Sequence, residues 1–506
     1  MMGVMQDATH PYPAELDGGM PDPRPRRREW PLVVLALVLL GVVAFMQRPG
    51  EPDPLAAREA KSGKLVDPVG VNPLVGIGKA SLWLKGQLSN AGDANGAKDL
   101  IRIGDDYARS AADRFRMAVL AGELDGWKER ESRFEKLEAK LDPDSPLRAD
   151  IATVRAVKFA GGEEGPAPAE PAAKEGLKER HGWFARLVLA GEDPAEDSAL
   201  ERETARDGEV LVAVLGLFML VFFAALVAGV VILILLTIRA ATGKLHSGLS
   251  MAPGAAAGDR ALWLETFSVF LLGFLAVKGA AAGLEQVVGN KQWLAVATLL
   301  MQWSLIGVVF WPRLRGMPAE QFRQELGWHR GKGVMQEISA GIMGYLAGLP
   351  IYICTAIVVV VVSVLIEMIR KGMQGVPGDD LPVPDNKVLD MVSGASGITL
   401  LLLAGLIVIW APLVEESIFR GALYRHIRAR LGGFLGMVAA VGLVAAAFAL
   451  AHAYVMAGVI MVATLGAIFA LMREWRGSLI APMTAHFLHN GTILLLLLSI
   501  LPLMRG

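Results

Sequence analysis

The stretch Ala411-Pro-Leu-Val-Glu415-Glu416-Ser-Ile-Phe-Arg420-Gly421 sets two adjacent carboxylates and a guanidinium among strongly apolar residues. It continues an apolar run over residues 395–414, which is long enough to cross a bilayer as a helix. A charged side chain at the centre of a membrane helix costs about 2.5–3.5 kcal/mol on insertion scales, so such residues usually face a protein interior or a water-filled cavity. The stretch therefore predicts a membrane helix with a functional site inside it.

The spacing of the three charges separates their expected roles. On a helix, Glu416 and Arg420 lie on one face, in the acid-before-base order that favours an ion pair. Glu415 points about 100° away, so we expect Glu415 to be left without that partner. The alternative is a helix end that reaches cytoplasmic water, where Glu416 and Arg420 form a solvated pair.

Two further polar patterns follow in apolar segments, again at helical spacing. Phe448 precedes His452 by four residues, and His486 precedes Asn490 by the same interval, with Pro482 marking the start of the second helix. Each residue also has a structural interpretation. His452 can be a core histidine bonded to a backbone carbonyl, and Asn490 can join neighbouring helices as a buried polar contact.

Together, the patterns Glu-Glu-x-x-x-Arg, Phe-x-x-x-His and His-x-x-x-Asn resemble those of the CAAX-protease and bacteriocin-processing family of intramembrane endopeptidases, also called ABI or CPBP. The resemblance covers roughly residues 262–501. It implies that Glu415 and His452 activate a water molecule, while His486 and Asn490 stabilise the oxyanion. His489 can face the same cavity, but the spacing favours His486 for this role.

The resemblance also implies that Glu416 and Arg420 hold the catalytic groups in place. A metal site is the alternative chemistry, in which Glu415, His452 and His486 bind zinc and leave a fourth position for water. The sequence contains no His-Glu-x-x-His helix, and three ligands from three helices are a weak signal for a metal. We therefore favour glutamate catalysis without a cofactor and keep zinc, as in a metalloprotease, as the alternative.

The composition fixes the broad class. The chain has 506 residues, 53% of them hydrophobic, which is too apolar for an ordinary soluble enzyme and long enough for a multi-span bundle with a further domain. Its formal net charge of −1 argues against a nucleic-acid partner. The single cysteine, Cys354, lies in an apolar run and is expected to pack as a small hydrophobic residue.

Four segments differ in composition. Residues 1–29 are rich in proline and basic groups and predict a disordered cytoplasmic N-terminus. Residues 30–46 predict a transmembrane anchor; their bulky C-terminal end favours this over a cleaved signal peptide. Residues 49–208 are highly charged and predict a water-exposed, mostly helical domain, and residues 209–506 predict the membrane domain, with the protease motifs in 395–502.

The expected fold is an all-α, multi-span helical bundle with about eight or nine spans. The arginine and lysine residues that flank the spans all fall on one side of the membrane, and the positive-inside rule predicts that this side is cytoplasmic. Residues 49–208 are then expected on the outer side. The apolar runs after the anchor cover residues 210–238, 262–283, 293–311, 335–366, 395–414, 433–453, 455–472 and 479–502.

This topology raises a difficulty, because a regular helix over 433–453 puts His452 near the leaflet opposite Glu415, across about 30 Å of membrane. Catalysis requires the two residues to meet. We therefore expect Pro412, Gly432-Gly433 or residues 451–454 to mark short, displaced or broken helices that line a wet cavity.

The predicted function is hydrolysis of a peptide bond in a membrane-associated protein or peptide, by an enzyme that resembles CAAX prenyl endopeptidases. The alternative is a non-catalytic membrane scaffold or peptide-immunity factor of the same fold. We expect a multi-pass protein of the bacterial inner (plasma) membrane, with the lipid bilayer and the peptide substrate as partners. The partner of residues 49–208 stays open.

Overall fold

A computed structural model describes residues 29–46, 72–91, 101–102, 104–105, 108, 110–159, 170–249, 257–374, 391–392, 394–395, 397–452 and 456–505. The elements of these residues are helices, with no β-strand among them, which confirms the all-α class. The predicted disordered N-terminus lies outside the described residues, except for Glu29.

Eight of the described helical stretches are long and apolar enough to cross a membrane, which agrees with the predicted number of spans. The apolar helix α1 (Trp30–Met46) is shorter than these eight. The eight stretches are built from α10 (Pro194–Ala241), α11 (Ala257–Glu285), α12 (Lys291–Ser304) with η1 (Leu305–Phe310) and α13 (Trp311–Leu314), α15 (Val334–Gln374), α17 (Gly397–Gly405) through α19 (Tyr424–Arg428), α20 (Gly433–Leu450), α21 (Met456–Arg476), and α22 (Ile480–Ile500) with η4 (Leu501–Met504).

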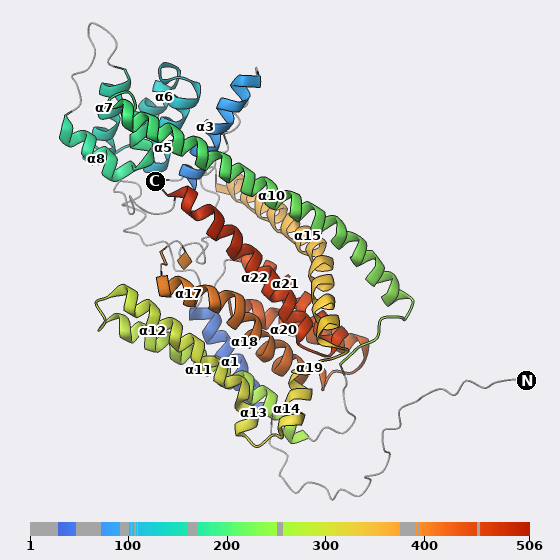
Figure 1. Cartoon of the computed structure of the whole chain (residues 1–506). Helices are drawn as coiled ribbons and strands as arrows, with labels where there is room; N and C mark the ends of the chain where they lie inside the picture. The colour runs from blue at the N-terminus through green and yellow to red at the C-terminus, as the bar shows by residue number, and fades with distance from the viewer. Residues whose placement is uncertain are drawn as a thin grey trace, which may run out of the picture.

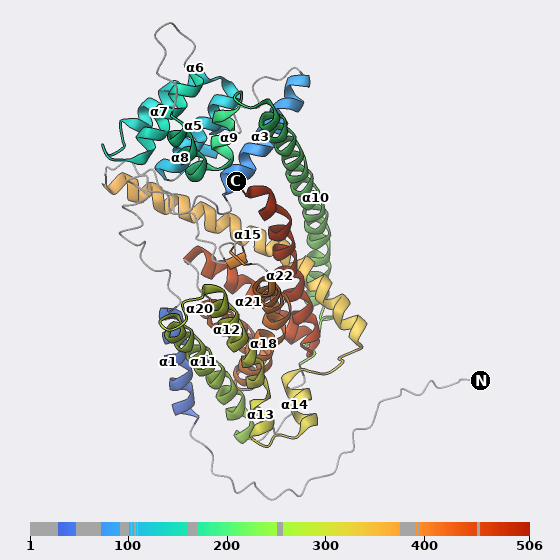
Figure 2. The same cartoon turned by 60° about the vertical axis from the view of Figure 1, so that its left-hand side comes forward.

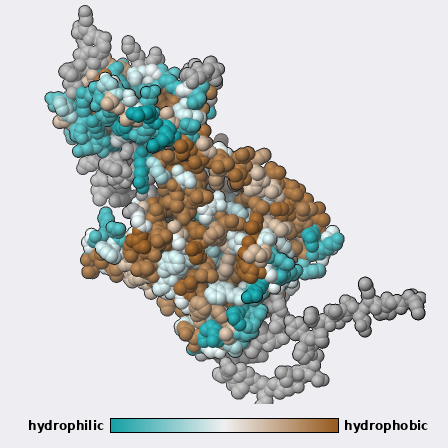
Figure 3. Space-filling view, viewed as in Figure 1, coloured by the Kyte–Doolittle hydropathy of each residue, from teal (hydrophilic) through white to brown (hydrophobic). Residues whose placement is uncertain are grey.

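A second group of helices packs around its own core at one end of the molecule (Figure 1). Phe115, Phe134 and Trp183 are buried there, and a capping box between Ser110 and Asp113 starts one of its helices. Hydrophilic residues cover much of this group, while hydrophobic ones cover much of the middle of the molecule (Figure 3). The group comprises α3 (Pro73–Ala91), α5 (Ala111–Asp125), α6 (Trp127–Glu138), α7 (Pro146–Lys158), α8 (Pro171–His181) and α9 (Trp183–Leu189).

Helix α10 joins the two parts without interruption, so the change in composition near residue 208 is not a break in the backbone. Lys79 of α3 is buried against it, with its ammonium 3.0 Å from Glu203 and 2.9 Å from Asp207. The backbone N–H of Asn72 also donates to the carbonyl of Met504, at 3.0 Å. The helices of this second group, called the polar helices below, are therefore tied both to α10 and to η4 at the end of α22.

The membrane helices are arranged so that the basic ends lie far from the polar helices. Helices α13 and α14 (Ala319–Leu326) lie at the opposite end of the molecule in both views (Figures 1 and 2), and α19 lies toward the same end in Figure 1. All three helices contain arginine. The main core sits between α1, α11, α20 and the helix that carries Glu415. Helices α10 and α15 pack on one another and expose long apolar faces, as lipid-facing helices do.

Candidate active site

The helix that carries Glu415 is irregular on both sides of that residue. Two π-helical segments, η2 (Leu406–Trp410) and η3 (Glu416–Leu423), flank the short α18 (Ala411–Glu415). Pro412 has no N–H to continue the α-helical ladder, and it is the second residue after η2. Such π-helical turns redirect side chains and are frequent at functional sites. The irregularity re-aims the carboxylates relative to a straight helix.

Glu416 is shared by two partners in the interior. Its Oε1 accepts a hydrogen bond from Arg420 at 2.9 Å and lies 2.9 Å from Nδ1 of His486. The side chains of Glu416 and Arg420 are fully buried, so the solvated pair considered from the sequence is not what forms. A buried carboxylate with two charge-assisted contacts fixes both the guanidinium and the imidazole.

Arg420 is held from its other sides by aromatic rings and a carbonyl. Its guanidinium carbon lies 4.2 Å from the ring centre of Phe448 and 5.3 Å from that of Phe469. Its second terminal nitrogen donates to the Gly466 carbonyl at 3.2 Å. The ring faces attract the cation, which reduces the cost of keeping it out of water. Phe448 of the sequence pattern thus serves the charged pair, a contact that the spacing does not indicate.

Glu415 and His452 meet, as catalysis requires. Nε2 of His452 lies 3.8 Å from Oε2 of Glu415. Nδ1 of His452 lies 2.7 Å from the Phe448 carbonyl, so Nδ1 carries the proton and Nε2 keeps a lone pair in the neutral ring. Oε2 of Glu415 is buried with no hydrogen-bond partner among the described residues. The carboxylate of Glu415 and the imidazole of His452 therefore face one another and can act as an acid–base pair.

The meeting of Glu415 and His452 has a backbone cause. Helix α20 starts after Gly432, with Gly433 at a φ of +66° that glycine adopts at no steric cost, and it ends at Leu450. Ala451 caps it, so His452 leaves the helix axis instead of continuing along it. Helix α20 nevertheless keeps the length of a membrane span, and the helical stretch that carries Glu415 runs from Gly397 to Arg428. Glu415 therefore lies in the middle of its stretch and not at one end, which is where the sequence-based expectation was wrong. Residues 453–455 lie outside the described part of the chain.

Asn490 lies on the same helix as His486 and forms a hydrogen bond with the backbone of η2. Its side-chain nitrogen donates to the Ile407 carbonyl at 2.8 Å. Ile407 belongs to η2, where the α-helical bonding pattern is interrupted. An amide nitrogen carries two hydrogens, so one of them remains for another acceptor. Asn490 thus supports the π-helical turn that precedes Glu415.

A cavity of about 660 Å³ joins these groups. Four of the predicted site residues line it, namely Glu415, His452, His486 and Asn490, while Glu416 and Arg420 are not among its lining. The cavity is also lined by polar groups outside the three motifs, from three different helices. These are Gln302, Tyr352 and His489, of which only His489 has a sequence signal, its three-residue spacing from His486.

The predicted zinc set does not fit this arrangement. Among the described residues, no group of three or more His, Cys, Asp or Glu side chains is disposed to bind a metal ion. The geometry brings Glu415 and His452 together as a pair, so we derive no step through a metal.

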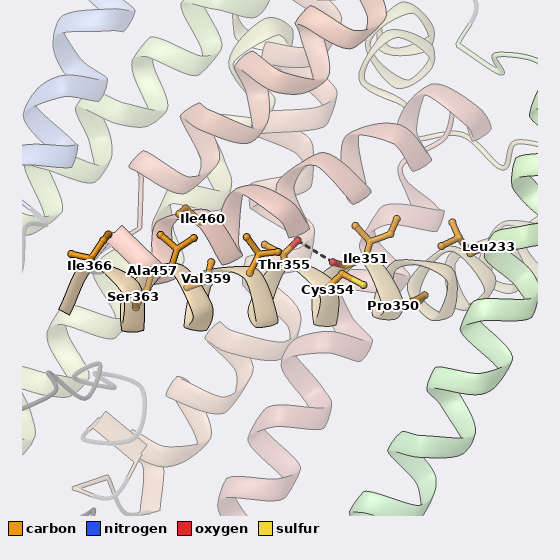
Figure 4. A pocket seen from close by; sticks show the side chains of 12 residues that line it. Leu233, Pro350, Ile351, Cys354, Thr355, Val359, Ser363, Ile366, Ala457 and Ile460 are labelled. Atoms are coloured by element: carbon orange, nitrogen blue, oxygen red, sulfur yellow. Dashed lines mark hydrogen bonds between the residues drawn. The ribbon is translucent and has the colours of Figure 1, made fainter. Parts of the chain in front are cut away.

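A second cavity, of about 610 Å³, has a different character. It runs along α15 and is lined mainly by aliphatic side chains, with Cys354 and Ser363 among them (Figure 4). The hydroxyl of Thr355 donates to the Ile351 carbonyl at 2.9 Å, so its proton is used inside the helix. No carboxylate or imidazole is among the described residues that line it, and we place no chemistry there.

The comparisons with known proteins agree with the motif resemblance. Residues 397–492 match the family model of the Rce1-like type II CAAX prenyl endopeptidases. That segment contains all seven residues of the three motifs, from Glu415 to Asn490. No curated protein and no solved structure matches the chain. Residues 397–492 of this integral, multi-pass membrane protein are therefore similar to the Rce1-like family of CAAX prenyl endopeptidases.

Proposed function

We propose that the protein is an intramembrane endopeptidase that hydrolyses a peptide bond in a membrane-associated protein or peptide. The observation that carries the proposal is the meeting of Glu415 and His452, 3.8 Å apart, in a cavity between membrane helices. His486, on a third stretch of chain, lines the same cavity. A base, its partner and donors for a developing negative charge are the groups that peptide hydrolysis needs.

In the proposed reaction, Glu415 and His452 bind the attacking water together. The water donates one hydrogen to a Glu415 oxygen and the other to the lone pair on Nε2 of His452. Glu415 takes a proton as the water oxygen attacks the peptide carbonyl carbon, which gives a tetrahedral oxyanion. The same proton then passes to the leaving amine as the C–N bond breaks, so Glu415 acts first as base and then as acid.

The oxyanion is stabilised from α22. Glu416 fixes the orientation of the His486 ring through Nδ1, at 2.9 Å, and the ring serves as a hydrogen-bond donor to the oxyanion. Asn490 contributes the hydrogen that it does not donate to Ile407. Arg420 holds the Glu416 carboxylate in place through its hydrogen bond, so its role is to position His486.

Finer points of the proposal follow the family match. We infer glutamate-dependent catalysis, because the described geometry pairs Glu415 with His452 and offers no metal-binding group. A prenylated CAAX peptide is one substrate class to test, and the bacterial inner membrane is the localisation that we expect. The polar helices over residues 72–200 would lie on the outer side.

The direct test is proteolysis by the purified full-length protein in detergent, on a mixed peptide library that includes prenylated CAAX peptides. We expect cleavage by the wild-type protein and none by His452→Ala or His486→Ala, each with a thermal stability close to wild type. Binding of a peptide without cleavage by the wild-type protein would instead favour a scaffold or immunity factor.

A further inference from the structure

The cavity carries hydrogen-bonding side chains that the proposed reaction does not use. Gln302 comes from α12, Tyr352 from α15 and His489 from α22, and all three line the cavity. They are neutral polar groups in a wall that is otherwise mostly apolar. Polar side chains at membrane depth usually serve a function, because each must be hydrogen-bonded to be tolerated.

His489 turns toward a different wall from its neighbour on α22. Its ring packs edge-to-face on two rings of α15, with centroids 6.3 Å from Tyr345 and 5.8 Å from Tyr352. Asn490 instead reaches Ile407 in η2. Successive residues on a helix point about 100° apart, so α22 contributes to two walls of the cavity.

Gln302 contributes a polar group to the wall of the cavity that lies near η2. It belongs to α12, which packs against α17 and η2. Tyr352 and His489 lie on the α15 side. A peptide that reaches Glu415 through the cavity therefore passes between polar groups on two walls.

The charge of the lining indicates what kind of peptide fits. Glu415 is the one carboxylate among the described lining residues, and no Lys or Arg is among them. Arg420 is fully buried and paired with Glu416. An acidic side chain or a terminal carboxylate beside the scissile bond would have no cation to bind, whereas an uncharged segment has no such need.

An extended peptide segment needs hydrogen-bond partners for its main chain, which a helix does not. A helix satisfies its own backbone groups, but a peptide opened for hydrolysis exposes N–H and C=O groups, which are costly in apolar surroundings. Gln, Tyr and His can each donate and accept hydrogen bonds. We propose that Gln302, Tyr352 and His489 form a subsite that binds the main chain of an extended, uncharged peptide segment beside Glu415 and His452.

This inference rests on the proposed peptidase function, and its first test uses kinetics of the full-length protein. The substrate is the library peptide that the wild-type protein cleaves fastest. Gln302→Leu, Tyr352→Phe and His489→Phe each remove one hydrogen-bonding group, and each should raise KM about 2- to 10-fold with kcat nearly unchanged. Phe487→Leu is the matched control on α22, since Phe487 is 47% exposed and outside the cavity lining, and its KM should equal that of wild type.

The second test removes single N–H groups from the main chain of the peptide, which are the groups that the subsite is proposed to bind. Single amides around the scissile bond are replaced in turn by esters, which lack the N–H. At least one ester should raise KM by a similar factor in the wild-type protein, and that increase should vanish in the variant that lost the matching side chain.

The outcomes separate the two claims. If all three variants have the KM of the wild-type protein, or if no ester changes KM, the proposed subsite is contradicted. The peptidase function stands in either case, provided that the wild-type protein cleaves the peptide. If one variant does not fold, the ester series on the wild-type protein decides alone. If the wild-type protein cleaves no peptide in the library, the proposed function and the subsite both fail.

Discussion

Nδ1 of His486 lies 2.9 Å from Oε1 of Glu416, the same oxygen that accepts the hydrogen bond from Arg420. One buried carboxylate oxygen thus links a guanidinium on its own helix to an imidazole on α22. The consequence is that substitutions at this carboxylate or its cation affect folding and catalysis together. Glu415, whose own neighbour is His452, is separated from that linkage.

Arg420→Ala should lower stability strongly. The change leaves Glu416 buried with only His486 beside it, and breaking a buried pair from one side costs about 3–5 kcal/mol. Thermal unfolding in detergent measures the effect. Arg323→Ala is the control, because Arg323 forms an exposed pair with Glu320 and should change the free energy of unfolding by less than about 1 kcal/mol. Equal melting temperatures for the two variants would contradict the buried linkage.

Asn490→Ala should reduce activity less than loss of the base. Removing one oxyanion donor typically lowers kcat by about 10²–10³. The variant also loses the hydrogen bond to Ile407, which contributes about 0.5–1.5 kcal/mol of stability. Steady-state kinetics and a melting curve separate the two effects. A variant with wild-type kcat and lowered stability would show that Asn490 acts only on the π-helical turn.

Which of these contacts can be predicted from the sequence depends on whether one element carries both partners. The Glu416–Arg420 pair follows from its four-residue spacing, because both residues lie on one helix. The contact of His486 with Glu416 joins residues 70 apart in the chain, and no local pattern encodes it. The number of spans followed from apolar runs of membrane length.

Two features could not be predicted for a physical reason. The π-helical turns around Glu415 have the same apolar composition as an α-helix, so periodicity does not reveal them. Tyr352 and Gln302 are polar residues in apolar helices, and their place in the cavity depends on how α12 and α15 pack. The pairing of Glu415 with His452 was expected from the family resemblance alone.

Acid should destabilise the polar helices through His181. Burial lowers the pKa of His181 below its ordinary value of 6.5, against the raising effect of its hydrogen bond with Asp150, whose carboxylate lies 3.1 Å away. The unfolded chain then binds more protons, so stability is complete above about pH 6.5 and is lost as the pH falls further. Melting temperatures of the full chain should decline from pH 7 to pH 5.

The matched comparison for this prediction uses two histidine variants. His181→Gln should show a shallower decline between pH 7 and pH 5, whereas His246→Gln, at an exposed position, should follow the wild-type curve. Burial raises the pKa of Asp150, but the hydrogen bonds from His181 and Arg180 outweigh it and lower that pKa, so a second loss of stability is expected as the pH falls below about 3.8. Parallel curves for all three proteins would rule out His181 as the source.

The predicted orientation can be tested with single cysteines after Cys354→Ser. Glu135→Cys, on the exposed surface of α6, should react with an impermeant thiol reagent in intact cells. Arg430→Cys, among the basic residues after α19, should react only after permeabilisation. Labelling of both positions in intact cells would overturn the placement of the polar helices outside.

The most direct measurement of the central claim is the activity and melting temperature of Glu415→Gln beside the wild-type protein. The substitution keeps the shape of the side chain and removes the base, and Glu415 is outside the Glu416–Arg420–His486 linkage. The account predicts loss of peptide cleavage with a melting temperature close to wild type. Full activity of Glu415→Gln would contradict the proposed mechanism.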